Sequence, residues 1–273
     1  MVTEYGNDRM YENVISFIDE NMKFEPKSYN RSYLERRIQS RIRRVGVDTY
    51  SDYLKYLKSN DKEQAELIDT LSVNVTEFFR NVEVWEEMKH ILRDETANKR
   101  NVSCWSAACS DGREPYSIAM LSHDDPKINE RRVNITATDI DEESLEKARN
   151  GVYNSSRITD IAAQLETLSD IEKYIDTSGD EKQFAVKNYI KRVVDFEKHD
   201  LISGQSKSGF DIVLCRNLLI YINTQYKEKM FDTLTKSIDS GGYLIIGRSE
   251  TLPTSYTDMY EIYDRKNHIY KKK

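Results

Sequence analysis

The sequence predicts an α/β protein in which an all-helical N-terminal domain precedes a larger domain with a mostly parallel sheet. Apolar residues recur at helical spacing through roughly the first ninety residues, whereas strand and helix patterns alternate from about Asn101 onwards. A stretch rich in β-branched and aromatic residues interrupts this alternation at about 155–200. We therefore expect a helical domain at 1–93 and an α/β domain at 94–273, with a small β subdomain inserted at about 155–200.

The helical domain contains one stripe that is regular enough to define a helix. Leu34, Ile38, Ile42 and Val45 follow the i, i+4, i+8, i+11 pattern, and Gly46 is a natural stop. This pattern predicts a helix with one apolar face turned to a core. A later helix, expected to complete the domain, carries Trp85, Met88, Ile91 and Leu92.

The second domain is predicted from strands and helices that follow one another at short intervals. We expect strands within 102–109, 133–141, 210–217 and 241–249, and helices at 113–122, 142–150 and 223–238. The segment 261–272 is expected to form a terminal strand or hairpin. Such alternation is typical of a parallel sheet with helices on both faces.

The composition is that of a folded protein and excludes several functions. The chain has 18 Tyr, 8 Phe and 2 Trp but only 4 Pro and 10 Gly, whereas disordered chains are poor in aromatic residues. Its 41 basic and 47 acidic residues leave a net charge of −6, which argues against a general nucleic-acid binder. No apolar run approaches the roughly 18 residues of a membrane span, and the N-terminus does not resemble a signal peptide. We expect a cytoplasmic protein that does not insert into a membrane.

Cysteine and histidine are too few and too scattered to predict disulfides or a metal site. Cys104, Cys109 and Cys215 contain no C-x-x-C pair, and the four histidines have no ligand-like spacing to one another or to the cysteines. We expect no metal.

Polar side chains follow three of the predicted strands, where an open α/β sheet binds its ligand. They lie in 106–114, at Asp139 and Asp141, and at 216–217. The first turn lacks G-x-G-x-x-G, and Glu114 at the start of its helix disfavours a pyrophosphate and therefore NAD. An acid after the second strand suits a ribose diol, so a cationic, phosphate-free nucleoside such as S-adenosylmethionine (SAM) fits. The alternative is that Asp139 and Asp141 only cap the next helix.

Four blocks of sequence resemble one known family. They are N-V-T-E-F-F-R at 74–80, W-S-A-A-C-S-D-G-R-E-P-Y-S at 105–117, A-T-D-I-D at 137–141 and C-R-N-L-L-I-Y at 215–221. Together and in this order they resemble the CheR family of chemotaxis receptor methyltransferases, over almost the whole chain. The resemblance implies a helical domain and a Rossmann-like, SAM-dependent methyltransferase domain with an inserted antiparallel β subdomain.

The resemblance also implies an activity, protein-glutamate O-methyltransferase. Such enzymes transfer a methyl group from SAM to glutamate side chains of methyl-accepting chemoreceptors in chemotactic adaptation, and leave S-adenosylhomocysteine (SAH). The partners would be the cytoplasmic helices of the receptors, and nothing demands more than a monomer. Two alternatives remain: a non-catalytic, SAM-sensing adaptor that docks on receptors, or a methyltransferase with another protein substrate. A nucleic-acid amino-methyltransferase is disfavoured because R-N-L-L-I-Y replaces its usual N/D-P-P-Y/F loop.

The residues that match the family's motifs define the expected site. Glu114 would face the amino end of the methionine part, and Asp139 would bind the ribose. Arg80 and Tyr221 are the expected catalytic residues, Tyr221 either as a hydrogen-bond donor or as a stacking platform. Phe78 and Phe79 are expected in the core. The full expected cofactor-binding set is Asn74, Thr76, Arg80, Glu114, Asp139, Asp200, Leu201, Arg216 and Asn217.

Three positions depart from the family pattern. Arg113 stands where a second acid is usual, so Glu114 alone would be the cofactor's carboxylate ligand in that turn. Arg248 replaces a common histidine in a G-x-S-E turn whose role the sequence does not explain. The loop at 177–183 lacks the full glycine–proline pattern that grips a receptor C-terminal peptide in some members, which makes such a tether doubtful here.

The expected chemistry needs no general base, because a glutamate with a pKa of about 4.3 is already ionised at neutral pH. Alignment is the main contribution, and Arg80 would keep the acceptor carboxylate charged and in line.

The helical domain also carries a basic segment. Residues 31–44 contain six Arg and one Glu. A solvated helix face is the plain explanation. The alternative, favoured by the resemblance, is a docking surface for acidic receptor helices. The expected docking residues are Arg36, Arg37, Arg41, Arg43 and Arg44.

Overall fold

The structure is a computed structural model of the chain, and it describes residues 8–22, 24–72, 76–155, 160–177 and 182–273. These residues form two compact units. The first comprises 1–73 together with 221–227, and the second comprises 74–220 together with 228–273. Asn74 lies outside the described residues.

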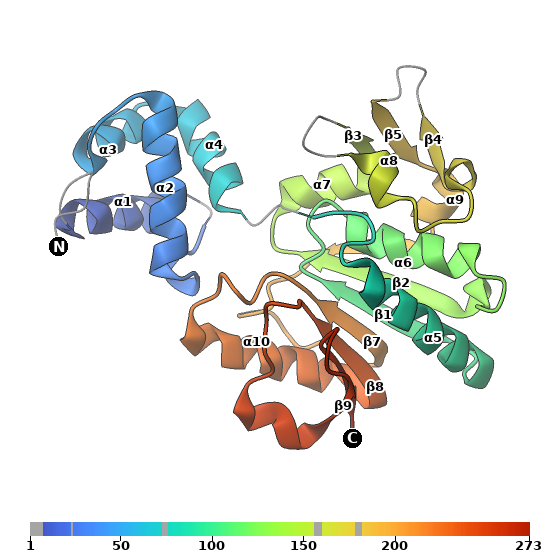
Figure 1. The fold of residues 1–273 in the computed structure, drawn as a ribbon. Coiled ribbons are helices and arrows are strands. Elements are labelled where there is room, and N and C mark those ends of the chain that lie inside the picture. Colours follow the sequence, from blue (N-terminus) through green and yellow to red (C-terminus); the bar gives the residue numbers. More distant parts are fainter. Residues whose placement is uncertain (1–7, 23, 73–75, 156–159, 178–181) are drawn as a thin grey trace. The chain divides into compact units, whose positions relative to one another are not determined.

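The first unit is helical, as expected (Figure 1). Its apolar faces meet in one core that includes Val14, Ile18, Ile38 and Leu57, each with no exposed surface. Gly46 ends the second helix with a φ of 76°, which favours glycine. The helices are α1 (Asp8–Asn21), η1 (Pro26–Ser28), α2 (Arg31–Val45), α3 (Tyr50–Lys58) and α4 (Asp61–Leu71).

A short segment from the far part of the sequence completes this unit. Tyr221 accepts a backbone hydrogen bond from Asn30 at 2.8 Å, and Asn223 donates one to Ser28 at 2.9 Å. Ile222 pairs with Tyr29 in an isolated antiparallel bridge and is only 2% exposed. The segment 221–227 is therefore part of the helical unit, which the sequence did not predict.

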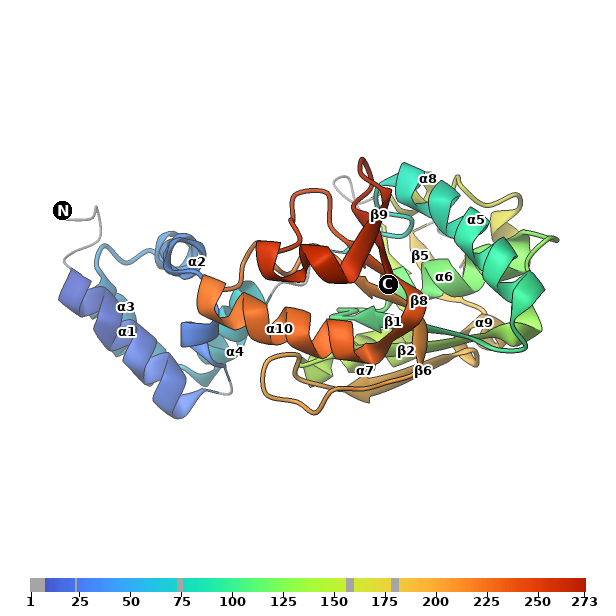
Figure 2. The ribbon, with the colours of Figure 1, turned by 90° about the horizontal axis from the view of Figure 1, so that it is seen from below.

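The second unit contains a seven-stranded sheet in the order β6-β2-β1-β7-β8-β10-β9 (Figures 1 and 2). The first five strands of this order are parallel, and a C-terminal hairpin adds two antiparallel strands. The strands are β1 (Val102–Ala107), β2 (Val133–Asp139), β6 (Val194–Lys198), β7 (Phe210–Cys215), β8 (Ile238–Ile246), β9 (Tyr260–Asp264) and β10 (Ile269–Lys272).

Helices of the second unit follow the strands as the alternation predicted. Helices α5 and α6 pack against each other and on β1, while α7 packs on β2 and β6. They are α5 (Val82–Asn98), α6 (Arg113–Asp124) and α7 (Glu142–Asn150), with the short η2 (Glu130–Arg132) and η4 (Thr254–Met259). Helix α10 (Thr224–Ser237) begins in the 221–227 segment of the first unit, and its residues from 228 onwards belong to the second.

A small antiparallel sheet of order β3-β5-β4 forms the insertion, seen above α6 in Figure 1. Its elements are β3 (Val152–Asn154), α8 (Ile161–Gln164), η3 (Ile171–Lys173), β4 (Ile175–Thr177), β5 (Gln183–Val186) and α9 (Asn188–Lys191). The insertion therefore begins slightly before residue 155. Strand β6, which the expected range of 155–200 included, belongs to the main sheet because it pairs in parallel with β2.

The division between the units also differs from the expected one at residue 93. Helix α5 packs in the core of the second unit, where Trp85 and Met88 have no exposed surface. The segment 76–93 therefore belongs with the sheet. Helical periodicity shows that α5 has a buried face, but it does not show which core buries it. Within the described ranges, no helix is long and apolar enough to cross a membrane.

Candidate active site

The candidate site lies where the order of the parallel strands reverses. Strand β1 lies between β2 and β7. The chain adds β2 and β6 on one side of β1, and it then adds β7 and β8 on the other side. The loops that follow these strands diverge there and leave room for a ligand. The carboxyl ends of β1, β2 and β7 are the three places at which the sequence carries polar chemistry.

The turn between β1 and α6 has an unusual backbone. Ala108, Ser110 and Gly112 all have positive φ, at 61°, 51° and 89°. A side chain at Gly112 would meet Cβ of Ala148 at 2.8 Å, so this position requires glycine both for its backbone and for its packing against α7. The turn is thereby held close to α7.

Asp139 joins that turn to the end of β2. Its Oδ2 accepts a hydrogen bond from the amide of Ser110 at 2.8 Å, and its Oδ1 accepts one from the amide of Asp141 at 2.9 Å. Burial raises the pKa of the Asp139 carboxyl above its ordinary value. The amide of Ile140 also donates to this carboxylate, so three of its roughly four acceptor positions are occupied and one remains for a diol hydroxyl.

The alternative role, capping of the next helix, applies to Asp141. Its carboxylate accepts from the amide of Glu143 at 3.1 Å and from the hydroxyl of Ser144 at 2.8 Å, at the start of α7. Asp139 does not cap α7.

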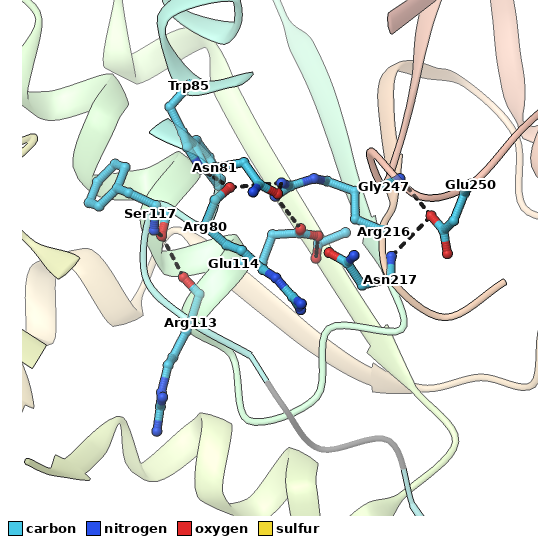
Figure 3. Close-up of polar contacts among 12 residues, drawn as sticks. Arg80, Asn81, Trp85, Arg113, Glu114, Ser117, Arg216, Asn217, Gly247 and Glu250 are labelled. Carbon is cyan, nitrogen blue, oxygen red and sulfur yellow. Dashed lines mark hydrogen bonds and ion pairs between the residues drawn. The ribbon is translucent and has the colours of Figure 1, made fainter. Parts of the chain in front are cut away.

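Glu114 is held from two sides. Its Oε1 accepts from the hydroxyl of Ser106 at 2.9 Å, and its Oε2 pairs with Nη1 of Arg216 at 3.1 Å (Figure 3). The side chain of Glu114 is 12% exposed and that of Arg216 is 2% exposed. Arg216 is therefore almost closed to solvent, and we assign it to the support of Glu114 rather than to direct contact with a ligand.

Arg216 also reaches the segment that precedes α5. Its Nη2 donates to the carbonyl of Arg80 at 2.7 Å and to Oδ1 of Asn81 at 3.1 Å, as Figure 3 shows. Burial lowers the pKa of the Arg216 guanidinium, and the nearby Glu114 carboxylate opposes this shift. One buried cation thus links the end of β7, the start of α6 and the backbone of Arg80.

The segment 76–81 is fixed by backbone contacts. Arg113 donates from Nη1 to the carbonyl of Thr76 at 2.9 Å, and the amide of Phe79 donates to the hydroxyl of Ser117 at 3.0 Å. Phe78 and Phe79 are 1% and 2% exposed, so both are core residues, as expected. The side chain of Arg80 is half-buried.

Arg113, the departure from the family pattern, has a structural role. Its Nη2 pairs with Asp111 at 3.3 Å, and its guanidinium lies 5.1 Å from the ring centroid of Tyr153 in β3. Together with its bond to Thr76, these contacts connect the first turn, the segment before α5 and the inserted sheet.

Asp200 and Leu201 follow β6. Asp200 accepts from the amide of Ile202 at 2.8 Å through Oδ1 and from the hydroxyl of Ser203 through Oδ2. Leu201 is 6% exposed. Asp200 thus stabilises its own turn, a local role that the sequence did not predict.

Tyr221, one of the two expected catalytic residues, lies in the first unit. Its ring is 4.7 Å from the ring of Tyr33 on α2, with the planes inclined by 47°. The ring of Tyr221 therefore packs on an aromatic neighbour, and its backbone is fixed by Asn30.

The basic helix α2 does not present all its arginines to solvent. Arg36, Arg43 and Arg44 are exposed, and Arg37 is half-buried with its guanidinium 5.3 Å from the ring centroid of Tyr33. The expectation that Arg41 docks a partner is wrong. Its side chain is only 6% exposed and forms an ion pair with Glu63, which is itself buried.

In the turn that follows β8, the sequence did not point to Glu250 and left the role of Arg248 unexplained. Glu250 is buried and accepts hydrogen bonds from backbone amides of the loop after β7. Arg248 pairs with Glu83 at the start of α5, at 3.3 Å. A single acid beside a glycine, as in G-R-S-E, was the available signal for Glu250.

The donors and acceptors at the switch point fit SAM. Asp139 offers an acceptor to a diol, and Glu114 offers a carboxylate to a cationic group. The hydroxyl of Ser110, in the same turn, is buried and has no protein partner among the described residues. The described part of the chain contains no cluster of three or more His, Cys, Asp or Glu that could hold a metal ion.

Comparisons with known proteins identify the family of the chain. Two family descriptions match the chain: CheR methyltransferase, all-alpha domain, over residues 9–72, and CheR methyltransferase, SAM binding domain, over residues 74–269. A chemotaxis protein methyltransferase of Listeria monocytogenes is 32% identical over 235 residues, which cover 84% of this chain and 85% of that protein. The chemotaxis protein methyltransferase 1 of Vibrio cholerae is 31% identical over 245 residues, which cover 85% of this chain and 86% of that protein.

Similarity to solved structures is weaker. The N-methyltransferase NodS of Bradyrhizobium japonicum, solved with SAH, aligns at 12% identity and a TM-score of 0.35, over 62% of this chain and 63% of that chain. This score is too low to support any conclusion. The two family matches together span most of the sequence, and the chain therefore belongs to the CheR methyltransferase family, with both its all-helical domain and its SAM-binding domain.

Proposed function

We propose that this SAM-dependent methyltransferase esterifies glutamate side chains of chemoreceptors, and so serves chemotactic adaptation. The observation that carries the proposal is the pair of carboxylates at the switch point, Glu114 and Asp139, each held by hydrogen bonds to neighbouring elements. Such a pair suits a ligand that has a ribose and a positive charge but no phosphate. The names of the curated relatives support the role in chemotaxis.

The residues of the site take distinct roles in this proposal. Asp139 binds the ribose hydroxyls, and Glu114 binds the amino group of the methionine part. Arg216 holds Glu114 in place. The remaining cofactor contacts are assigned to Asn74, Thr76, Arg80, Asp200, Leu201 and Asn217.

Bound SAM supplies a methyl group activated by the positive charge of its sulfonium. The chain then has to align an acceptor that is already ionised, since a glutamate side chain has a pKa of about 4.3. Burial of that carboxylate would raise its pKa, and the guanidinium of Arg80 would oppose the shift. Tyr221 either donates a hydrogen bond to the acceptor or supports it by stacking. In this proposal the reaction needs no metal, and chelators leave turnover unchanged.

Receptor docking is assigned to the exposed arginines of α2. Arg36, Arg43 and Arg44, with the half-buried Arg37, give this helix a local positive charge in a chain whose net charge is −6. Acidic receptor helices would be attracted to this helix. Arg41 has no part in docking because its charge is already neutralised inside the helical unit.

The proposal is tested by incubating the protein with methyl-labelled SAM and receptor-containing membranes. Label released by alkali as methanol supports a glutamate ester. Alkali-stable label on the receptor would contradict O-methylation, and label on other proteins alone would indicate another substrate. SAH binding without any transfer would indicate the adaptor.

Arg80→Ala tests the assigned catalytic residue in the same assay. We expect most turnover to be lost while SAH is still bound. The control is Arg113→Ala, which removes another half-buried arginine side chain. Its turnover shows how much of the loss in Arg80→Ala comes from lost packing alone. Turnover near that of the wild type in Arg80→Ala would reject the role.

A further inference from the structure

The G-R-S-E turn at 247–250 places a buried carboxylate beneath the loop that follows β7. Glu250 is 3% exposed. Its Oε2 accepts from the amides of Gly247 at 2.5 Å and Asn217 at 3.0 Å (Figure 3). Its Oε1 accepts from the amide of Leu219 at 2.7 Å. The amide of Ile220 adds a further backbone hydrogen bond.

The buried negative charge of Glu250 is stabilised by hydrogen bonds that come mainly from one short stretch of backbone. A buried charge is costly unless it is well hydrogen-bonded, and the donors found for Glu250 among the described residues are main-chain amides. Three of them come from residues 217–220, so the charge is stable only when this loop keeps the conformation in which its amides converge. Glu250 therefore constrains the loop more than a neutral side chain would.

The local backbone agrees with such a constraint. Asn217 has a φ of 62°, a conformation that is unusual for a residue other than glycine. A Cβ at Gly247 would lie 2.6 Å from Oε2 of Glu250 and 2.9 Å from the amide nitrogen of Asn217. Glycine at 247 therefore permits the close approach of the turn to the loop.

The loop held in this way begins at the candidate site. Asn217 directly follows Arg216, whose guanidinium pairs with Glu114 and donates to the carbonyl of Arg80. A continuous series of contacts thus runs from Glu250 through the backbone of Asn217 to Arg216, and from there to Glu114.

We propose that Glu250 is a positioning residue for methyl transfer: its buried carboxylate fixes the 216–220 loop, and through Arg216 it fixes Glu114 and the segment at Arg80. This inference rests on the proposed function, because it assigns Glu250 a part in the same site. It also gives the G-x-S-E turn a role that the sequence left unexplained.

The test compares Glu250→Gln with Ser249→Ala, a control at the exposed neighbour in the same turn. The glutamine has nearly the same shape, but its NH₂ group cannot accept a hydrogen bond, so amides on one side of the carboxylate lose their partner. At a temperature where both variants are folded, we expect the kcat of Glu250→Gln to fall by about 100-fold, because misaligned reacting groups lose rate steeply. The SAH affinity of Glu250→Gln should fall as well. Ser249→Ala should have the kcat and the SAH affinity of the wild type.

A merely structural role predicts a different result. It would lower the Tm of Glu250→Gln but leave kcat, KM and SAH affinity unchanged below the transition, and this outcome would overturn the proposal. Wild-type protein that binds no SAH would instead reject the proposed function, so the two failures are distinguishable.

Two further measurements apply if Glu250→Gln does not fold. Gly247→Ala keeps the charge but forces the turn and the loop apart, and we expect the same loss of kcat. In the wild type, the amide proton resonances of Asn217, Leu219 and Gly247 should shift together as pH is lowered, with a parallel loss of SAH affinity. A common shift of these amides without any change in SAH affinity or turnover would contradict the proposal.

Discussion

Two acids that are only two positions apart in the sequence have different roles. Asp141 caps α7, whereas Asp139 receives the amides of Ser110 and Asp141 and lies at the end of β2. The same residue type therefore supports a helix in one case and offers an acceptor at the candidate site in the other. The difference arises from the neighbouring turn, since Ser110 lies 29 positions before Asp139 in the sequence.

The raised pKa of Asp139 predicts how cofactor binding depends on pH. Because burial raises this pKa, the carboxylate takes up a proton at a higher pH than an exposed aspartate would, and it then loses acceptor capacity. We expect SAH affinity to decrease as pH is lowered, with the decrease beginning at a higher pH than the ordinary titration of aspartate near 3.9 would give. Isothermal titration calorimetry measures this dependence.

Asp139→Asn is the matched variant for that titration. We expect it to weaken SAH binding by about 1.5–3 kcal/mol, because hydrogen bonds to a charged group are the strong ones, and to reduce the acidic decrease to the part that Glu250 contributes. An unchanged pH dependence in this variant would show that another group titrates.

Arg41 was expected on the docking surface of α2, but the structure places it inside the helical unit. Nε and Nη2 of Arg41 both donate to Glu63, which also accepts from the hydroxyl of Tyr53 at 2.8 Å. The hydrogen bonds that Arg41 donates to the Glu63 carboxylate hold the pKa of Arg41 above its ordinary value, against the effect of burial. The pair is thus an internal element of the helical unit.

Removal of Arg41 should therefore affect stability rather than docking. Arg41→Met leaves Glu63 buried without its cation, and we expect a loss of about 3–5 kcal/mol in the free energy of unfolding. Arg43→Met, at an exposed position of the same helix, should change it by no more than about 0.5 kcal/mol. Urea unfolding of the two variants measures the difference, and equal stabilities would contradict the structural assignment.

Helix α7 is linked to the site through the acid at its N-terminus. The cap at Asp141 fixes the start of the helix, and Ala148 near its other end packs on the turn that contains Gly112. Helix α5 likewise combines two tasks, since its buried face joins the core of the sheet while the residues before it form part of the candidate site. Both helices thus contribute to the core and to the position of functional residues.

Substitution of Asp141 can separate the effect of helix capping by Asp141 from the effect of ribose binding by Asp139. Asp141→Ala should destabilise the protein by about 1 kcal/mol, the usual cost of a lost N-cap. SAH affinity should remain within a few-fold of the wild type, because Asp139 keeps its side chain. Thermal unfolding and calorimetry provide the two values, and a loss of SAH affinity as large as that of Asp139→Asn would show that both acids bind the ligand.

The chain as a whole separates a basic helix from an acidic remainder. Residues 31–44 contain six of the basic residues, while the net charge of the chain is −6. If receptor docking uses α2, association is driven by long-range attraction that salt screens, with a Debye length of about 10 Å at 0.1 M ionic strength.

This charge distribution predicts a dependence of methylation on salt. We expect the second-order rate constant of receptor methylation to fall as ionic strength rises, and the variant with Arg36, Arg43 and Arg44 changed to Glu to react slowly at low salt. Initial rates at several salt concentrations test this prediction, with SAH affinity as the control that should not change. A charge-reversed variant as fast as the wild type would contradict docking through α2.

Much of the fold was evident in the sequence because it depends on local patterns. The stripe from Leu34 to Val45 defined α2, and Gly46 ended it. The apolar strands and the polar residues that follow them indicated the carboxyl ends of β1, β2 and β7. Motifs such as 105–117 and 137–141 also indicated the family, which the matches over residues 9–72 and 74–269 bear out.

Contacts between distant residues were decided only by the tertiary structure. Periodicity could not show that α5 packs with the sheet, that 221–227 completes the helical unit, or that Arg41 meets Glu63. The same holds for Arg216 and Glu114, which are 102 positions apart, and for Glu250 and Asn217, which are 33 apart. A sequence pattern records which face of an element is apolar, whereas the partner of a buried charge is set by the three-dimensional packing that removes it from water.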